Sequence, residues 1–120
     1  MIKVFMIDST EKSLYYNAVL KYVDASNIDV EESTDRALNR LSAKPYQLIV
    51  LSRGTGKYDL YDVVDLIKQT KIVNKAYIFI VEDNPTVAAK LTGMLRGHKV
   101  YSFKSNQLTE LEKLVERMAS

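Results

Sequence analysis

The 120-residue sequence contains no cysteine and only one histidine, His98. The chain therefore cannot form a disulfide or a thiolate metal site, and a histidine cluster is excluded as well. Long apolar runs are also missing, since the run from Tyr77 to Val81 is far shorter than the roughly 20 residues that a membrane helix needs. We see no signal-peptide pattern after Met1. We therefore predict a cytoplasmic domain without membrane association.

Neither sign of charge is in large excess. Lys and Arg number 17 and Asp and Glu number 15, which gives a net charge of +2. A protein dedicated to nucleic acid normally concentrates basic residues on one face, so we predict no direct nucleic-acid binding. The length predicts one domain spanning residues 1–120.

Short apolar runs of strand length recur along the chain. Three of them are nearly continuous, which is typical of strands that are covered on both faces of a parallel sheet. The five runs are Ile2–Ile7, about Ile28–Val30, Gln47–Leu51, Ala76–Val81 and Val100–Phe103.

Helical patterns separate these runs. Asp83-Asn84-Pro85 is a helix start signal, because a capping side chain precedes a proline that fits the first turn. Gly97 is a plausible stop for that helix, and Ser105 or Asn106 is the expected cap of the last one. The apolar faces predicted for the first, third and last helices are Leu14, Ala18, Val19 and Tyr22; Leu60, Val63, Val64 and Ile67; and Leu108, Leu111, Val115 and Met118.

The strand–helix unit thus occurs five times. Right-handed crossovers leave few topologies, and the best fit is an α/β fold of the flavodoxin-like, doubly wound type: a five-stranded parallel sheet of order 2-1-3-4-5 flanked by five helices. In this fold the carboxyl ends of strands one, three, four and five meet at one crevice. The residues at these ends are Asp8 and Ser9, Ser52, Val81 with Glu82, and Lys104.

Five strand–helix units, an acid after the first strand, a polar tip on the third and "YSFKS" (Tyr101 to Ser105) after the fifth resemble the receiver domain of two-component response regulators. The resemblance covers the whole chain. It implies that a histidine kinase phosphorylates an aspartate at the end of strand three. Two acids after strand one would help to hold Mg²⁺, while a Ser or Thr after strand four and a lysine after strand five would bind the phosphoryl oxygens.

The sequence departs from that pattern at most of these positions. Asp8 and Lys104 match it, but Ser9, Ser52 and Val81 stand where the metal-binding acid, the phospho-acceptor and the Ser or Thr are expected. A serine hydroxyl cannot form an acyl phosphate, and one carboxylate is a poor Mg²⁺ site. We interpret the chain as a degenerate pseudo-receiver without catalytic residues, metal or cofactor, in which Asp8 and Lys104 form an ion pair.

The resemblance then implies a phosphorylation-independent protein-interaction module in bacterial signal transduction. Its expected contact surface is helix four, strand five and helix five, with a homodimer as one form of contact. Tyr101 is the main candidate because it stands at the position of the family's switch aromatic, and we expect it at the strand-five edge beside helix four. The other candidates are Lys90, Met94, Lys99, Phe103 and Glu110.

Three alternatives stay open at this stage. An enzyme on a flavodoxin-like sheet would need a cofactor loop and an acid–base pair, which the strand tips do not offer. A transcription regulator would carry a DNA-binding output domain beyond residue 120. A conventional phospho-receiver would need Asp8 or Glu82 as a substitute acceptor, and neither stands at the tip of strand three.

Overall fold

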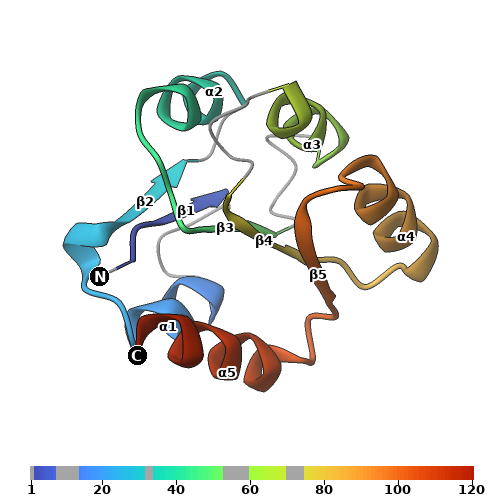
Figure 1. Ribbon diagram of the computed structural model, residues 1–120. Coiled ribbons are helices and arrows are strands. Elements are labelled where there is room, and N and C mark those ends of the chain that lie inside the picture. Colours follow the sequence, from blue (N-terminus) through green and yellow to red (C-terminus); the bar gives the residue numbers. More distant parts are fainter. Residues whose placement is uncertain (1, 8–13, 32–33, 53–59, 70–74) are drawn as a thin grey trace.

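The computed structural model describes residues 2–7, 14–31, 34–52, 60–69 and 75–120. Within these residues, five strands alternate with five α-helices, and a short 3₁₀ helix precedes the second strand (Figure 1). The strands are β1 (Val4–Ile7), β2 (Ile28–Glu31), β3 (Leu48–Ser52), β4 (Tyr77–Val81) and β5 (Lys99–Phe103). The helices are α1 (Leu14–Leu20), η1 (Ala25–Asn27), α2 (Thr34–Ala43), α3 (Leu60–Gln69), α4 (Pro85–Met94) and α5 (Leu108–Ala119).

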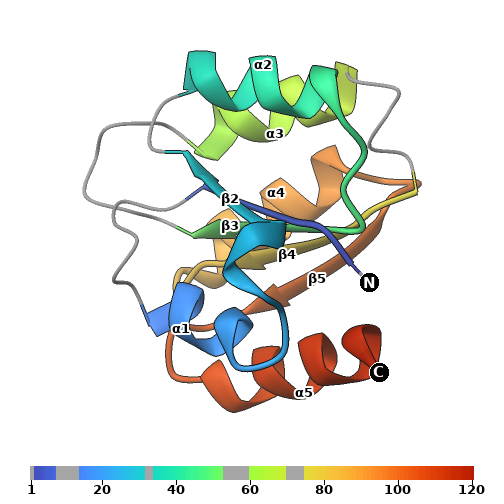
Figure 2. The ribbon, with the colours of Figure 1, turned by 90° about the vertical axis from the view of Figure 1, so that its left-hand side faces the viewer.

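All strands are parallel and their order in the sheet is β2-β1-β3-β4-β5. The views in Figures 1 and 2 show three layers, with α1 and α5 on one face of the sheet and α2, α3 and α4 on the other. The fold class predicted from the alternation of apolar runs and helical patterns is therefore confirmed.

The central strands are apolar because both of their faces are covered. Every residue of β1 and of β3 is buried, as is expected for parallel strands between two helical layers. β5 is an edge strand with a single neighbour, and only Phe103 within it is buried.

The sheet divides the apolar interior into two cores. On the side of α2, α3 and α4, the buried side chains of Phe5, Ile49 and Ile78 pack with those helices. On the side of α1 and α5, Met6, Val50, Phe79 and Phe103 pack with Val19 of α1 and with Leu111 and Val115 of α5. The alternation of strand side chains between the two cores follows from the two-residue period of a strand.

Helix α4 begins and ends where the sequence predicts. The Asn84 side chain accepts hydrogen bonds from the backbone N–H groups of Thr86 and Val87, at 2.9 and 3.3 Å, and Pro85 occupies the first turn. Gly97 has a φ of +97°, a conformation that favours glycine because it has no Cβ. Both local predictions are confirmed.

The predictions for the end of the first helix and for the start of the last helix are wrong. The apolar face predicted for the first helix includes Leu14 and Tyr22, but α1 ends at Leu20, and Leu14 and Tyr22 are 68% and 38% exposed. Gln107 rather than Ser105 or Asn106 is the residue before α5, and its side chain makes no cap bond to that helix. Gln107 Oε1 instead accepts the backbone N–H of Lys104 at 2.7 Å.

Within the described residues, no helix combines the length and the apolar character needed to cross a membrane.

Candidate functional site at the carboxyl edge of the sheet

The tips of β3, β4 and β5 lie side by side at the carboxyl edge of the sheet. Ser52 is in register with Val81, and Val81 is in register with Phe103. Asp8 and Ser9, the residues that follow β1 in sequence, lie outside the described residues. The ion pair expected between Asp8 and Lys104 therefore stays a prediction.

Ser52 is buried and its hydroxyl is engaged. The residue is 1% exposed, and Oγ donates a hydrogen bond to the backbone carbonyl of Ile7 in the adjacent strand, at 3.2 Å. A buried hydroxyl normally has such a partner, because burying it without a hydrogen bond would lower the stability of the fold. The hydroxyl thus links β3 to β1.

Of the next two tips, the one at Val81 differs from a phosphoryl-binding arrangement and the one at Lys104 does not. Val81 is 4% exposed and its side chain has no hydrogen-bonding group. Lys104 is exposed after β5, and its backbone N–H is bonded to Gln107. Of the two side chains assigned to phosphoryl oxygens by the resemblance, only the lysine can make the contact.

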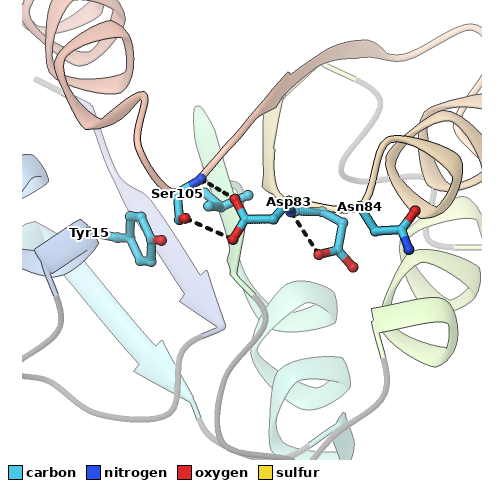
Figure 3. A pocket seen from close by; sticks show the side chains of 6 residues that line it. Tyr15, Asp83, Asn84 and Ser105 are labelled. Atoms are coloured by element: carbon cyan, nitrogen blue, oxygen red, sulfur yellow. Dashed lines mark hydrogen bonds between the residues drawn. The ribbon is translucent and has the colours of Figure 1, made fainter.

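An open pocket of about 340 Å³ lies at the same edge. Figure 3 shows Tyr15 from α1 on one side of it, Asp83 and Asn84 before α4 on the other, and Ser105 after β5 between them. The lining residues are Tyr15, Val81, Glu82, Asp83, Asn84 and Ser105.

Asp83 ties two loops together across this pocket. Its Oδ1 accepts the backbone N–H of Ser105 at 2.6 Å, and its Oδ2 accepts the Ser105 hydroxyl at 2.8 Å (Figure 3). The backbone bond, followed by the hydroxyl bond and the charge of Lys104, holds the pKa of Asp83 below its usual value of 3.8. The carboxylate thus fixes the segment before α4 against the segment after β5.

Glu82 is the buried acid of this edge. It is 6% exposed, and its Oε2 accepts the backbone N–H of Asp83 at 2.9 Å. Its own backbone N–H donates to the Phe103 carbonyl, which extends the pairing of β4 and β5 by one residue. The sequence offered Glu82 only as a substitute phospho-acceptor and gave no sign of this local role.

The pocket combines carboxylates with neutral donors. The side-chain oxygen of Asn84 is already occupied by its cap bonds to α4, and Asp83 by Ser105. Across the part of the chain that the structure describes, no three His, Asp or Glu side chains gather as a metal-binding group. The arrangement links the segment before α4 to the segment after β5.

The contact between Asp83 and Ser105 could have been anticipated only in part. Asp83 and Asn84 are both helix-capping residue types, and only one can cap α4. Because Asn84 does so, Asp83 is available for another donor. Nothing in the spacing indicates that this donor is Ser105, which is 22 residues away.

Replacing Ser105 with alanine should raise the folded-state pKa of Asp83 toward 3.8 without reaching it. The variant loses the hydroxyl bond but keeps the stronger backbone bond. Carboxyl carbon shifts recorded by NMR during an acid titration would measure this. Since the folded pKa is depressed, the stability from this contact is present above pH 3.8 and is lost as the pH falls through the folded pKa.

Ser102→Ala, in the exposed part of β5, is the control for this prediction. An unchanged Asp83 pKa in Ser105→Ala would contradict the assigned contact.

Tyr101 presents a partly exposed ring at the edge of the sheet. It is 44% exposed and contacts Phe79 edge-on, with ring centroids 5.7 Å apart, and Tyr77 in a stacked arrangement at 6.2 Å. Phe79 and Tyr77 belong to the core on the α1 and α5 side. The Tyr101 ring therefore lies on the α5 face of β5, although the sequence interpretation had placed it beside α4.

Only some of the other candidate contact residues share a face with Tyr101. Lys99 shares its face, with Nζ 4.8 Å from the centroid of the Tyr77 ring, and Glu110 is exposed on α5. Lys90 instead lies over the ring of Tyr61 in α3, at 5.1 Å. The two remaining candidates are Met94, which packs against the core on the α4 side, and Phe103, which is 8% exposed. Phe103 as a surface contact is thus a wrong prediction, since its ring fills the α5-side core.

Comparison with known proteins gives structural matches alone. No sequence-family profile matches the chain, and no curated protein matches it significantly. The beryllofluoride-activated NtrC4 receiver domain, solved in solution as a dimer, superimposes with a TM-score of 0.70 at 16% identity and covers 100% of both chains. The phosphorylated cyanobacterial phytochrome response regulator RcpA gives 0.69 at 17% identity, over 98% of this chain and 90% of its own.

A de novo designed Rossmann 2x3 protein also matches, with a TM-score of 0.64 at 12% identity over 98% of this chain and 89% of its own. A designed protein among the matches illustrates that this fold is not tied to one function. The chain therefore has the fold of response-regulator receiver domains, and what it does must be argued from its own residues.

Proposed function

We propose that the chain acts as a phosphorylation-independent receiver domain that binds a protein partner in bacterial signal transduction. The observation that carries the proposal is the state of Ser52. It stands at the position of the phospho-acceptor in the receiver pattern and is 1% exposed, and its hydroxyl donates a hydrogen bond to the Ile7 carbonyl. A serine there cannot form the acyl phosphate on which receiver switching depends.

The link between Asp83 and Ser105 supports a constitutive state. The receiver resemblance implies that phosphorylation repacks the tip of strand four and so moves the aromatic residue on strand five. Here a carboxylate of the chain itself already joins the segments that follow β4 and β5, through two hydrogen bonds. Val81 adds no group that would respond to a phosphoryl oxygen. The surface near β5 is thus held in one arrangement without chemical input.

The contact surface that we propose contains Tyr101 and Lys99 on β5 and Glu110 on α5. Tyr101 is preorganised because Phe79 and Tyr77 hold one part of its ring while 44% of the residue stays exposed. Such a ring contributes contact area with little loss of side-chain entropy on binding. Aromatic residues of this kind carry much of the binding energy in protein interfaces.

Acetyl phosphate with Mg²⁺, and separately beryllofluoride, should leave the protein unchanged. We expect no mass increase by intact mass spectrometry and no shifts in the amide NMR spectrum, because the buried Ser52 hydroxyl cannot replace an acceptor carboxylate. A conventional receiver treated in parallel controls for the reagents. A stoichiometric gain of one phosphoryl group that vanishes in Asp8→Asn or Glu82→Gln would refute the proposal and identify the acid that serves as acceptor.

A further inference from the structure

A second open pocket lies at the amino edge of the sheet, opposite to the edge with Ser52. Its volume is about 370 Å³, and it lies between the carboxyl end of α5 and the segments that lead into β3 and β4. Figure 2 shows the carboxyl end of α5 on the same side of the molecule as the start of the chain. The lining residues are Ile2, Gln47, Lys75, Tyr77, Arg117 and Met118.

The charge around this pocket is positive and unbalanced. Lys75 and Arg117 line it, and Lys99 lies over the ring of Tyr77. Nowhere in the described part of the chain does a carboxylate form an ion pair with these three side chains. Other lysines form ion pairs with carboxylates of the chain: Lys21 pairs with Glu112, and Lys44 pairs with Asp29. The positive charge here is therefore available to an external anion.

The rest of the lining is largely apolar. Ile2, Tyr77 and Met118 are half-buried and belong to the margin of the core on the α5 side. A thioether and an aromatic ring adapt well to an inserted apolar side chain. The pocket thus presents two cations beside an apolar floor, which suits a ligand with carboxylates flanking one apolar group.

We propose that this pocket binds an acidic peptide segment of a partner protein. Carboxylates of the segment pair with Lys75 and Arg117, and one aliphatic or aromatic side chain inserts against Tyr77 and Met118. Nucleic acid is less suited, because the net charge of the chain is only +2. This site goes beyond the proposed function, because none of its lining residues belongs to the contact surface of Tyr101, Lys99 and Glu110 proposed above.

The test uses a fluorescein-labelled peptide of glutamates surrounding a central Leu-Phe pair, with a matched peptide in which every glutamate is glutamine. Fluorescence polarisation at low and at physiological salt should show saturable binding of the acidic peptide alone, weaker at the higher salt. Lys75→Glu and Arg117→Glu should each weaken binding roughly fivefold or more, because an attraction becomes a repulsion. Amide shifts should map to Lys75, Tyr77 and Met118.

Lys68→Glu in α3, on the other face of the sheet, makes the same charge change and should leave affinity within about twofold, as expected for a screened distant charge. Thermal melts verify that each variant is folded. The proposal is overturned if the acidic peptide does not bind at millimolar concentration, or if Lys68→Glu weakens it as much as Arg117→Glu. It is also overturned if a poly-deoxythymidine oligonucleotide binds more tightly than the peptide and is lost with the same two variants.

Discussion

Replacing Arg40 with methionine should lower the free energy of unfolding by about 2 kcal/mol. Arg40 of α2 donates from Nε to Oε1 of Glu31 in β2, and its Nη1 lies 3.4 Å from Oδ1 of Asp29. The Glu31 side chain is 9% exposed, so the variant would leave a largely buried carboxylate without its partner. We expect a cost below that of a fully buried pair because the Arg40 side chain is 42% exposed. Urea unfolding monitored by circular dichroism measures the difference.

Arg96→Met is the matched control for this prediction. Arg96 is exposed after α4, and its backbone N–H is bonded to Gly93, so the same side-chain change should cost less than about 0.5 kcal/mol. The double variant Glu31→Gln with Arg40→Met should be more stable than the sum of the single changes implies, because neighbours in one network are coupled. Equal destabilisation in Arg40→Met and Arg96→Met would show that the pair with Glu31 contributes nothing.

The contacts of Asp29 and Glu31 also explain how β2, an edge strand with polar residues, is stabilised. Burial opposes ionisation of Asp29, but hydrogen bonds from Tyr46 at 2.7 Å and from Lys44, together with the charges of Lys44 and Arg40, lower its pKa. Burial and the bond to Asp29 raise the pKa of Tyr46, whose ring also packs on Phe5 at 5.3 Å. β2 is therefore attached to α2 and to the start of β3 by side-chain contacts in addition to the ladder with β1.

The sequence predicts the sheet well because the relevant signal is local and strong. A continuous apolar run such as Leu48 to Leu51 is typical of a strand that is covered on both faces. The Asn84-Pro85 helix start and the positive φ of Gly97 are each determined by residues within a single turn of the backbone. The chain order of the elements then leaves few topologies, so the strand order could be deduced without any contact information.

The arrangement of side chains at the two edges depends on contacts between distant segments, which local patterns do not encode. Ser105 was expected to cap α5 but is bonded to Asp83, and Phe103 was expected at the surface but fills a core. In both cases the residue type was compatible with either role. The residue that packs or bonds against each one determined its role. For Ser105 this residue is Asp83, which is 22 residues away, and for Phe103 it is Phe79 on β4.

Tyr101→Ala should weaken the binding of the native partner by about 1–3 kcal/mol, the range typical of truncated aromatic contacts. The ring is held by Phe79 and Tyr77 and exposes 44% of the residue, so its removal takes away a preorganised contact. Ser52→Ala should change binding by less than about 0.5 kcal/mol, because the buried hydroxyl contacts the Ile7 carbonyl and does not reach a partner. A partner captured from native extract and titrated by calorimetry provides the measurement.

Tyr22→Ala is the control for exposure, since Tyr22 is 38% exposed, follows α1 in the chain and belongs to neither β5 nor α5. We expect it to leave partner affinity unchanged. Thermal melts of all three variants separate lost binding from unfolding, which matters because Tyr101 also packs on the core residue Phe79. If Ser52→Ala abolishes binding in a folded protein while Tyr101→Ala binds normally, the carboxyl edge is the working site, and a partner that reads β5 constitutively is the wrong description of this domain.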